Sequence, residues 1–279
     1  MKELIKDIEK SLDIISYKSI INNDLLAESL VKGWDKVLRQ NIYPRNKEFL
    51  ISKASIYKDN YFNLAIRYAP EFEFNSSSKE SRLFSKVNAS YSLAININTI
   101  ESNNIIDIQT MLGYIGLTKL FYTYRFLENF INYLLLIEDN EREIGENIIK
   151  YYGESNLVTE FYDKLNNDND LKTLFEILKK KKNSSGENIF TYIDKKQSNL
   201  ERTYKHGYEG YKGKLNIKVY LLINDLRNLF VHSSLSASSG SGNPLVMFIL
   251  TTQLSEKILN YANIIFKNKI LIEKYKYNI

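Results

Sequence analysis

Apolar residues recur along most of this chain at the spacing of an amphipathic helix. Little interrupts that spacing, because the 279 residues include only three prolines and eleven glycines. Two early segments, 4–15 and 25–37, each carry an apolar stripe, and Asn23 and Asp24 offer an N-cap for the second. We therefore expect long helices through most of the chain.

The pattern changes to strict alternation over residues 87–97, where apolar residues occupy every second position. These residues are Val87, Ala89, Tyr91, Leu93, Ile95 and Ile97. A period of two predicts a β-strand. Its candidate partners are Leu64, Ile66, Tyr68, Phe72 and Phe74, joined to it by the polar segment 75–81. Together the two runs predict a small β-hairpin.

From residue 106 onward the helical spacing dominates. The apolar stripe of the longest predicted helix consists of Leu117, Leu120, Phe121, Tyr124, Leu127, Ile131, Leu134 and Leu135. Further helices are predicted over 187–203, 215–231 and 244–266. Asn243-Pro244 is a favourable N-cap and first-turn pair for the last of them.

Polar segments separate these predicted helices. The acidic segment 138–146 is expected to cap and solvate the helix after it, and Lys179–Lys182 before Asn-Ser-Ser-Gly predicts a basic surface turn. Residues 204–213 form a glycine-punctuated loop. The Ser/Gly-rich residues 233–242 are typical of a mobile connection.

The whole pattern predicts a mainly α protein with two regions. Residues 106–279 are expected to form a C-terminal antiparallel helical bundle. Residues 1–105 are expected to form an N-terminal region of unknown role, which is α or, with the small β-hairpin, α+β.

Composition excludes several kinds of chemistry. The chain has no cysteine and two histidines, so we expect no disulfide, no thiol catalysis, no metal site and no other cofactor. The net charge of +5 permits a polyanionic partner such as RNA. No apolar run approaches the roughly 20 residues that span a bilayer, and no apolar signal core follows Met1. We therefore expect a cytoplasmic protein with no membrane contact.

The strongest candidate for chemistry is the run 225–232 at the end of the predicted helix 215–231. On a helical wheel of about 100° per residue, the apolar residues share one face and the polar residues form a contiguous sector beside it. The apolar face holds Val219, Leu222, Leu226, Leu229 and Phe230, and the polar sector holds Arg227, Asn224, Asn228, His232 and Asp225.

Within that sector, Arg227 and His232 have the chemistry of RNA cleavage by the RNA's own 2′-hydroxyl. An arginine binds a phosphate through two parallel hydrogen bonds, and a histidine transfers protons near neutral pH. His232 should lie at the helix C-terminus, where the helix dipole favours the protonated imidazole. The structural alternative is a solvated helix face whose histidine caps carbonyls, and spacing alone favours that alternative.

The run Arg227-Asn228-Leu229-Phe230-Val231-His232 resembles the signature of HEPN-domain proteins. In that signature an arginine, often followed by Asn, Asp or His, precedes a histidine a few residues later. The resemblance covers about residues 106–279 and implies a helical bundle with the motif at a helix end. Members of that family are commonly homodimers in which two motifs form one composite ribonuclease site. They occur among toxins of toxin–antitoxin systems, abortive-infection proteins and CRISPR effector nucleases.

By residue, the resemblance implies that Arg227 binds phosphate, that His232 transfers protons and that Asn228 supports them. Asp225 is a further supporting candidate, although the signature does not require it. The implied activity is metal-independent cleavage of single-stranded RNA by a homodimer in bacterial antiphage defence or toxin–antitoxin control, with an antitoxin or regulatory protein as a candidate partner. The alternative is a non-catalytic HEPN-like module that binds a nucleotide or another protein.

Two further candidates lie outside the motif. Glu128 is on the apolar stripe of 117–135, where an unpaired carboxylate is costly. It either supports Arg227 or forms a structural salt bridge with Arg125. The loop 204–213 interleaves aromatic and basic residues that can stack bases and meet phosphates, or it is a tyrosine-rich surface turn. Its RNA-binding candidates are Tyr204, Lys205, His206, Tyr208, Tyr211 and Lys212.

Overall fold

The computed structural model describes residues 60–75, 77–97, 108–138, 151–200, 207–208, 211–215 and 217–277. Within these ranges the protein is mainly α-helical and contains no β-strand. The predicted helices over 4–15 and 25–37 lie outside the described residues. None of the described helices has the length and apolar character needed to cross a bilayer.

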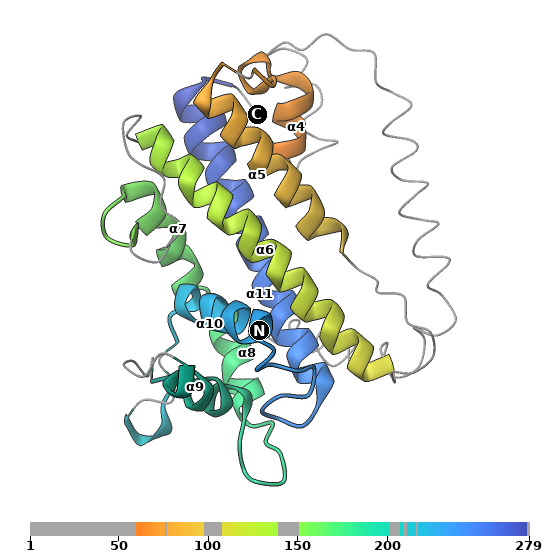
Figure 1. Cartoon of the computed structure of the whole chain (residues 1–279). Coiled ribbons are helices and arrows are strands. Elements are labelled where there is room, and N and C mark those ends of the chain that lie inside the picture. The colour runs from red at the N-terminus through yellow and green to blue at the C-terminus, as the bar shows by residue number, and fades with distance from the viewer. Residues whose placement is uncertain are drawn as a thin grey trace.

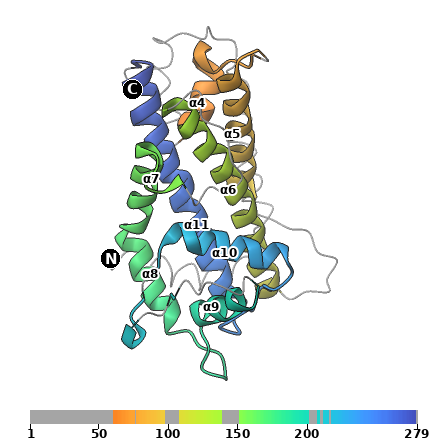
Figure 2. The same cartoon turned by 60° about the vertical axis from the view of Figure 1, so that its left-hand side comes forward.

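Three helices form the centre of the bundle: α5 (Lys79–Asn96), α6 (Ile108–Glu138) and α11 (Pro244–Ile265). α6 packs extensively against both of the others. In Figures 1 and 2, α5 runs opposite to α6, whereas α11 runs in the same direction as α6. The helix pair α7 (Asn156–Asn166) and α8 (Asn169–Lys179) returns along α11 in the opposite direction.

Two shorter helices close one end of this bundle. α10 (Val219–Val231) crosses α6 and α7, and α9 (Ile189–Leu200) packs against α8 and α10 (Figure 2). A single-turn helix, η3 (Tyr211–Gly213), lies on the connection between α9 and α10. This arrangement places the C-terminal end of α10 beside α6, near the close approach of α6 and α11.

Two glycines of α6 allow close packing, Gly116 against α11 and Gly113 against Ala237 in the segment before α11. A Cβ atom on Gly116 would lie 3.0 Å from the Cα atom of Phe248, and one on Gly113 would lie 2.6 Å from the Cβ atom of Ala237. Thr251 also faces Gly116, and its hydroxyl donates a hydrogen bond to the carbonyl of Met247 at 2.7 Å. The absence of a side chain at Gly116 therefore lets the backbones of α6 and α11 approach each other.

The N-terminal helices that the structure describes share the core of the bundle. α4 (Tyr61–Tyr68) docks on α11, where the side chain of Asn263 accepts the backbone N–H of Tyr61 at 2.7 Å. The ring of Phe62 stacks on Phe266 with centroids 4.5 Å apart, and Phe72 contacts Phe84 at the same distance. Residues on both sides of position 105 thus contribute to one hydrophobic core.

The last described turns are fixed to this core. Phe266–Lys274 (η4) continues α11 as a π-helix. Beyond it, the hydroxyls of Tyr275 and Tyr277 donate to the carboxylates of Glu80 and Glu71.

The predicted β-hairpin is wrong. Residues 87–96 belong to α5, residues 61–68 form α4, and Phe72 ends the single-turn helix η1 (Pro70–Phe72). The residues that α5 buries follow helical spacing: Leu83, Phe84, Val87, Tyr91 and Ala94. Leu93, which the alternation placed on the same face as Val87, is 52% exposed. The alternation coincided with part of a helical stripe that begins further upstream.

Several connections formed as predicted. Asn243 caps α11 by accepting the N–H of Leu245 at 2.9 Å, and Lys179–Lys182 ends α8 in an exposed turn. Of the predicted capping segment 138–146 the structure describes only Glu138, which accepts the N–H of Leu157 in α7 at 3.0 Å. The segment 233–242 differs from the prediction of a mobile connection, because it packs against the bundle and buries Leu235 and Ala237.

Candidate functional site

α10 carries the predicted motif at its C-terminal end. His232 is the C-cap residue and is exposed, and its backbone N–H donates to the carbonyl of Asn228 at 3.0 Å. Ser233 adopts a left-handed conformation with φ 55°. The N–H groups of Ser233 and Ser234 donate to the carbonyls of Phe230 and Leu229, which is the Schellman pattern of helix termination.

Arg227 is held between α6 and its own helix. Its guanidinium lies over the ring of Tyr124 on α6, 5.1 Å from the ring centroid, and its Nη1 donates to Oδ1 of Asn228 at 2.8 Å. The Tyr124 hydroxyl donates to Oδ1 of Asn224 at 3.1 Å. Arg227, Asn228 and Asn224, three of the predicted polar residues, are therefore grouped at the ring of Tyr124. The sequence pattern had placed Tyr124 only in the apolar stripe of α6.

The surroundings keep Tyr124 neutral and leave the Nε atom of Arg227 without a hydrogen-bond partner among the described residues. Burial, reinforced by the charge of Glu128 and opposed by that of Arg227, raises the pKa of Tyr124 to about 12. The Nε atom of Arg227 is buried and has no hydrogen-bond partner among the described residues. A buried donor without a partner is unfavourable for the stability of the fold.

Glu128 forms the salt bridge that the structural alternative predicted. Its Oε2 atom lies 2.8 Å from Nη1 of Arg125, one turn earlier on α6. None of the described contacts joins Glu128 to Arg227. The influence of Glu128 on the motif passes through Tyr124, whose pKa it helps to raise.

The polar sector is not continuously exposed, because Asp225 lies inside the protein. Its side chain is fully buried and accepts a hydrogen bond from the hydroxyl of Tyr208. Burial and the carboxylate of Asp225 raise the pKa of Tyr208 well above its ordinary value. The N–H of Tyr208 also donates to Asp194 of α9 at 2.8 Å. Asp225 thus fixes the loop before α10 and is not presented to a cleft.

The predicted RNA-binding loop is only partly described. Tyr204, Lys205 and His206 lie outside the described residues. Tyr208 is buried, so the prediction that it stacks an unpaired base is wrong. Tyr211 begins η3, and the side chain of Lys212 is exposed.

None of the described contacts joins Arg227 to His232. They are five residues apart, which places their side chains about 140° apart around the helix axis. Asn224 and Asn228 lie in the sector between them. One copy of α10 therefore presents the two groups in different directions.

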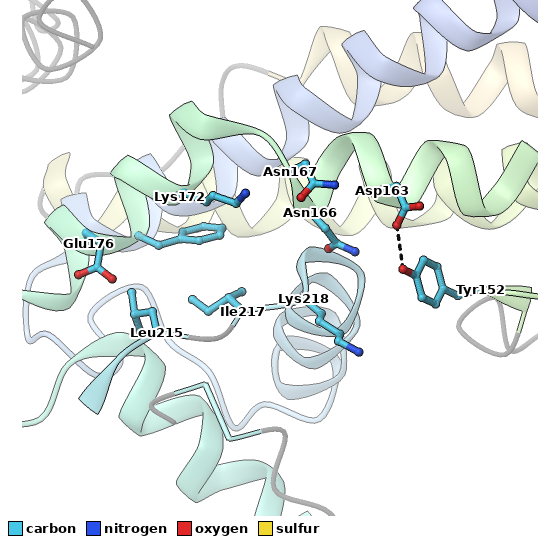
Figure 3. A pocket seen from close by; sticks show the side chains of 10 residues that line it. Tyr152, Asp163, Asn166, Asn167, Lys172, Glu176, Leu215, Ile217 and Lys218 are labelled. Atoms are coloured by element: carbon cyan, nitrogen blue, oxygen red, sulfur yellow. Dashed lines mark hydrogen bonds between the residues drawn. The ribbon is translucent and has the colours of Figure 1, made fainter. Parts of the chain in front are cut away.

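A cavity of about 490 Å³ opens at the other end of α10 (Figure 3). It is lined by Tyr152, Asp163, Asn166, Asn167, Lys172, Phe175, Glu176, Leu215, Ile217 and Lys218. These residues come from α7, α8, the segment before α7 and the segment before α10. No local sequence pattern predicts this cavity, because the segments that line it come together only in the folded chain.

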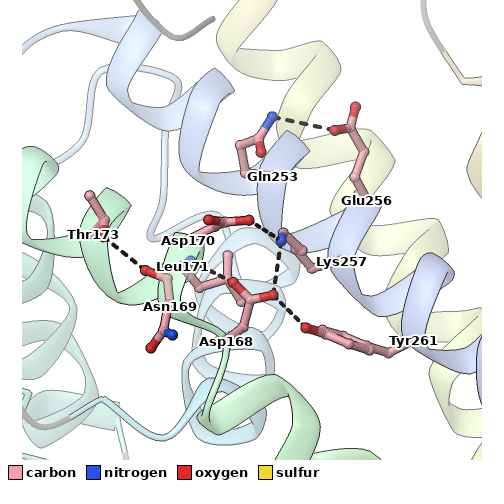
Figure 4. A network of polar contacts seen from close by, with 9 residues as sticks. All are labelled: Asp168, Asn169, Asp170, Leu171, Thr173, Gln253, Glu256, Lys257 and Tyr261. Atoms are coloured by element: carbon pink, nitrogen blue, oxygen red, sulfur yellow. Dashed lines mark hydrogen bonds and ion pairs between the residues drawn. The ribbon is translucent and has the colours of Figure 1, made fainter. Parts of the chain in front are cut away.

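A polar network fixes the N-terminus of α8 to α11 (Figure 4). Asp168 is buried and accepts hydrogen bonds from the N–H of Leu171 at 2.8 Å, Nζ of Lys257 at 2.9 Å and the hydroxyl of Tyr261 at 2.6 Å. Burial opposes ionisation of Asp168, but these hydrogen bonds outweigh it and lower its pKa. Lys257 also contacts Asp170 at 2.7 Å.

Comparison of this chain with known protein families, sequences and structures identifies no relative. Neither a protein-family model, nor a curated protein, nor a solved structure matches this chain.

Proposed function

We propose that this protein is a metal-independent endoribonuclease of the HEPN type, which cleaves single-stranded RNA as a homodimer in bacterial antiphage defence or toxin–antitoxin control. One observation carries the proposal. The guanidinium of Arg227 is held against the ring of Tyr124, on the same helix end as the exposed His232. A positioned guanidinium and an accessible imidazole are the two groups that this reaction needs.

In the proposed reaction the 2′-hydroxyl of a ribose attacks the adjacent phosphorus, and the 5′-oxygen of the next nucleotide leaves. A histidine accepts the proton of the 2′-hydroxyl, and a histidine also returns a proton to the 5′-oxygen. Arg227 stabilises the negative charge on the phosphorane. The products are a 2′,3′-cyclic phosphate and a 5′-hydroxyl.

The arrangement of α10 favours a site built from two copies. Because Arg227 and His232 diverge by about 140° around the helix, one copy does not direct both at one phosphate. Two copies whose α10 ends face each other bring the arginine of one towards the histidine of the other. Such a contact follows from twofold symmetry, in which each copy offers the same surface.

The direct test is RNA cleavage in EDTA by the wild type, Arg227→Ala and His232→Ala. Arg125→Ala is a matched control, because it removes an exposed arginine of α6 whose side chain forms a salt bridge with Glu128 and makes no described contact with Tyr124 or Arg227. We expect both motif variants to lose cleavage and the control to keep it, with cyclic phosphate ends identified by mass spectrometry. Equal cleavage by all four proteins removes the motif from the mechanism.

The second candidate is a non-catalytic HEPN-like module that binds a nucleotide or another protein. The same guanidinium favours it, because a positioned arginine binds a phosphate without any proton transfer. This candidate predicts RNA or nucleotide binding that depends on Arg227 and does not depend on His232, and no products. Cleavage that requires His232 excludes it.

A further inference from the structure

Six lysines gather at the end of the bundle that carries α9, which is the lower end in Figure 2. Four of them end α8 and begin the turn after it, and two lie on the connection between α9 and α10. The two segments are neighbours, because Nζ of Lys179 lies 3.9 Å from the position that a Cβ atom on Gly213 would take. All but the half-buried Lys179 are exposed. We call this set the lysine strip: Lys179, Lys180, Lys181, Lys182, Lys212 and Lys214.

Neighbouring carboxylates do not neutralise the lysine strip. Lys179–Lys182 and Lys214 form no ion pair with any residue that the structure describes. The nearest carboxylates along the chain from the run 179–182 are Glu176 and Glu187, and Oε1 of Glu187 already lies 3.7 Å from Nζ of Lys195. Like charges held together repel each other and oppose the compact state. The strip therefore carries a positive charge that a bound polyanion would neutralise.

The end of α8 explains only part of this arrangement. The C-terminus of a helix carries a partial negative charge, which favours lysines in its last turn. This accounts for Lys179 and Lys180, which are the last residue and the C-cap of α8. It does not account for Lys212 and Lys214, which a different segment brings to the same surface. A shared ligand accounts for both segments.

The segment 233–242 connects the strip to the motif on α10. The residue after the lysine run is Asn183, whose Cβ atom lies 3.5 Å from the position that a Cβ atom on Gly242 would take. Gly242 ends the segment, which begins directly after His232. Residues 226–255 include no Asp or Glu. A polyanion that leaves the strip at Asn183 can therefore reach His232 along hydroxyls and backbone groups, with no carboxylate from this part of the chain.

The composition of the strip fits the phosphate backbone of a nucleic acid. Each lysine offers a compact positive charge, and lysines that neutralise phosphates release the counterions of the backbone. Protein interfaces are instead depleted in lysine and enriched in aromatic residues. Stable attachment to a lipid surface takes an apolar anchor besides a basic patch. The exposed large apolar side chains of the described residues are Phe74, Leu93 and Val231, and none of them belongs to the strip.

We propose that the lysine strip binds the phosphate backbone of single-stranded RNA and that the strand continues over the segment 233–242 to the cleavage motif. The identity of the polymer as RNA rests on the proposed function. Because the strip contacts phosphates, its contribution to affinity does not depend on the base sequence. The strip holds the substrate and takes no part in the cleavage step.

The phosphate contacts are tested by RNA binding in the His232→Ala protein, which prevents cleavage. Fluorescence anisotropy with a labelled single strand of about 12 nucleotides, a length that single-strand sites cover, compares two triple variants. Lys180→Gln/Lys181→Gln/Lys182→Gln changes the strip, and Lys79→Gln/Lys86→Gln/Lys276→Gln removes the same charge from exposed lysines of α5 and the C-terminal turn.

We expect the strip variant alone to bind at least about tenfold more weakly at about 0.1 M salt, by the same factor for two RNAs of different sequence. Its slope of log affinity against log salt should fall by about 2, because each phosphate contact on a single strand contributes about 0.7. Adding Lys214→Gln should lower the slope by about 0.7 more, which shows that both segments hold the same strand.

The path to the motif is tested with a single cysteine, because the chain has no cysteine of its own. Ser238→Cys in the segment 233–242 and Ser77→Cys before α5 both replace exposed serines and are labelled with a maleimide photocrosslinker. We expect irradiation to join RNA to position 238 and not to position 77, and the strip variant to lose this product. Equal crosslinking from both positions overturns the proposed path.

The outcomes separate this inference from the proposed catalysis. Equal affinities and salt slopes for the two triple variants overturn the inference, even if the wild type cleaves RNA through His232. Strip-dependent RNA binding with no cleavage by the wild type retains the surface and rejects the ribonuclease. Displacement of RNA by polyglutamate of equal charge at equal concentration assigns the strip to an acidic protein and overturns the inference. Tighter strip-dependent binding to vesicles of phosphatidylcholine and phosphatidylserine in equal parts assigns it to a membrane and does the same.

Discussion

The guanidinium of Arg227 lies over the ring of Tyr124, 5.1 Å from its centroid, and so connects the motif on α10 to the central helix α6. The ring is itself held, because the Tyr124 hydroxyl donates to Asn224 one turn before Arg227. An arginine on an aromatic face keeps its charge while losing much of its rotational freedom. The contact is therefore the structural feature that positions the proposed phosphate-binding group.

The two functions of Tyr124 can be separated by substitution. Tyr124→Phe keeps the ring under Arg227 and loses only the hydrogen bond to Asn224, so we expect RNA cleavage within about threefold of the wild type. Tyr124→Leu loses the ring, and a partly buried cation–π contact of about 1–2 kcal/mol corresponds to roughly a tenfold loss of rate. Cleavage rates normalised to the folded fraction measure the difference. Equal rates for the two variants would mean that the ring does not position Arg227.

The network around Asp168 predicts a dependence of stability on pH. The folded state lowers the pKa of Asp168 below its ordinary value of 3.8, so the carboxylate stabilises the fold above about pH 4, and this contribution is lost as the pH falls through the folded pKa. Asp168→Asn keeps an N-cap acceptor for Leu171 but loses the charge beside Lys257. We expect it to lower the free energy of unfolding by about 2 kcal/mol at pH 7. The difference from the wild type should shrink below about pH 4, as urea unfolding at several pH values would show.

Asp168→Ala provides the comparison for the capping part. It removes the N-cap acceptor as well as the charge, so we expect a further loss of about 1 kcal/mol at every pH. A constant difference between the wild type and Asp168→Asn from pH 7 to pH 3 would contradict the role of the ionised carboxylate.

Local signals explain why much of the helical fold was predictable. The stripe of α6 and the cap at Asn243 each lie within one segment, and both formed as expected. The error over residues 87–97 arose because Val87 and Tyr91 satisfy a period of two and a helical spacing equally well. Leu83 and Phe84 settle the question in favour of a helix, and they lie just outside the alternating run.

At the candidate site, the sequence pattern predicted the place of His232 but neither the burial of Asp225 nor the contact of Arg227 with Tyr124. The position of His232 at a helix C-terminus followed from the Ser/Gly-rich segment after it. The wheel could not place Asp225 inside the protein, because its buried state depends on Tyr208 from a separate loop. Tyr124 is more than a hundred positions before Arg227, and only the packing of α6 against α10 brings their side chains together.

Alanine usually stabilises a helix relative to glycine, but at Gly116 of α6 we expect the opposite effect. At an open helical position Gly→Ala stabilises by about 0.5–1 kcal/mol. At Gly116 the new methyl group would meet the backbone of Phe248 at 3.0 Å as well as Thr251. We expect Gly116→Ala to destabilise the protein by about 1–3 kcal/mol in urea unfolding. Any increase in stability would show that α6 and α11 are not packed this closely.

The left-handed residue after α10 predicts a stabilising substitution. Ser233 has a positive φ of 55°, a conformation that is unfavourable for residues with a side chain and open to glycine. Ser233→Gly should raise the free energy of unfolding by about 0.5–1 kcal/mol, and the β-branched Ser233→Val should lower it by at least about 1 kcal/mol. Thermal unfolding of the three proteins gives the order. Greater stability of the valine variant would argue against the Schellman ending of α10.

Mixing two inactive variants tests whether the proposed site is composite. Arg227→Ala retains His232, and His232→Ala retains Arg227, so a mixed dimer contains one arginine and one histidine on different copies. If the reaction uses these groups across the interface, as their divergence around α10 predicts, co-refolding the two variants should restore a fraction of the wild-type cleavage. Each variant refolded alone should stay inactive.

Replacing Arg227 by lysine, which keeps the charge, makes the same mixing experiment more specific. Arg227→Lys keeps the charge but loses the planar group that binds a phosphate through two hydrogen bonds, and it should lose at least about tenfold in rate. A mixture of Arg227→Lys with His232→Ala should recover the arginine from the second copy and exceed the rate of either variant alone. If no mixture exceeds its components although size-exclusion chromatography shows mixed dimers, both groups act within one chain. Arg227 and His232 would then have to converge on one phosphate despite their separation of about 140° around the helix axis.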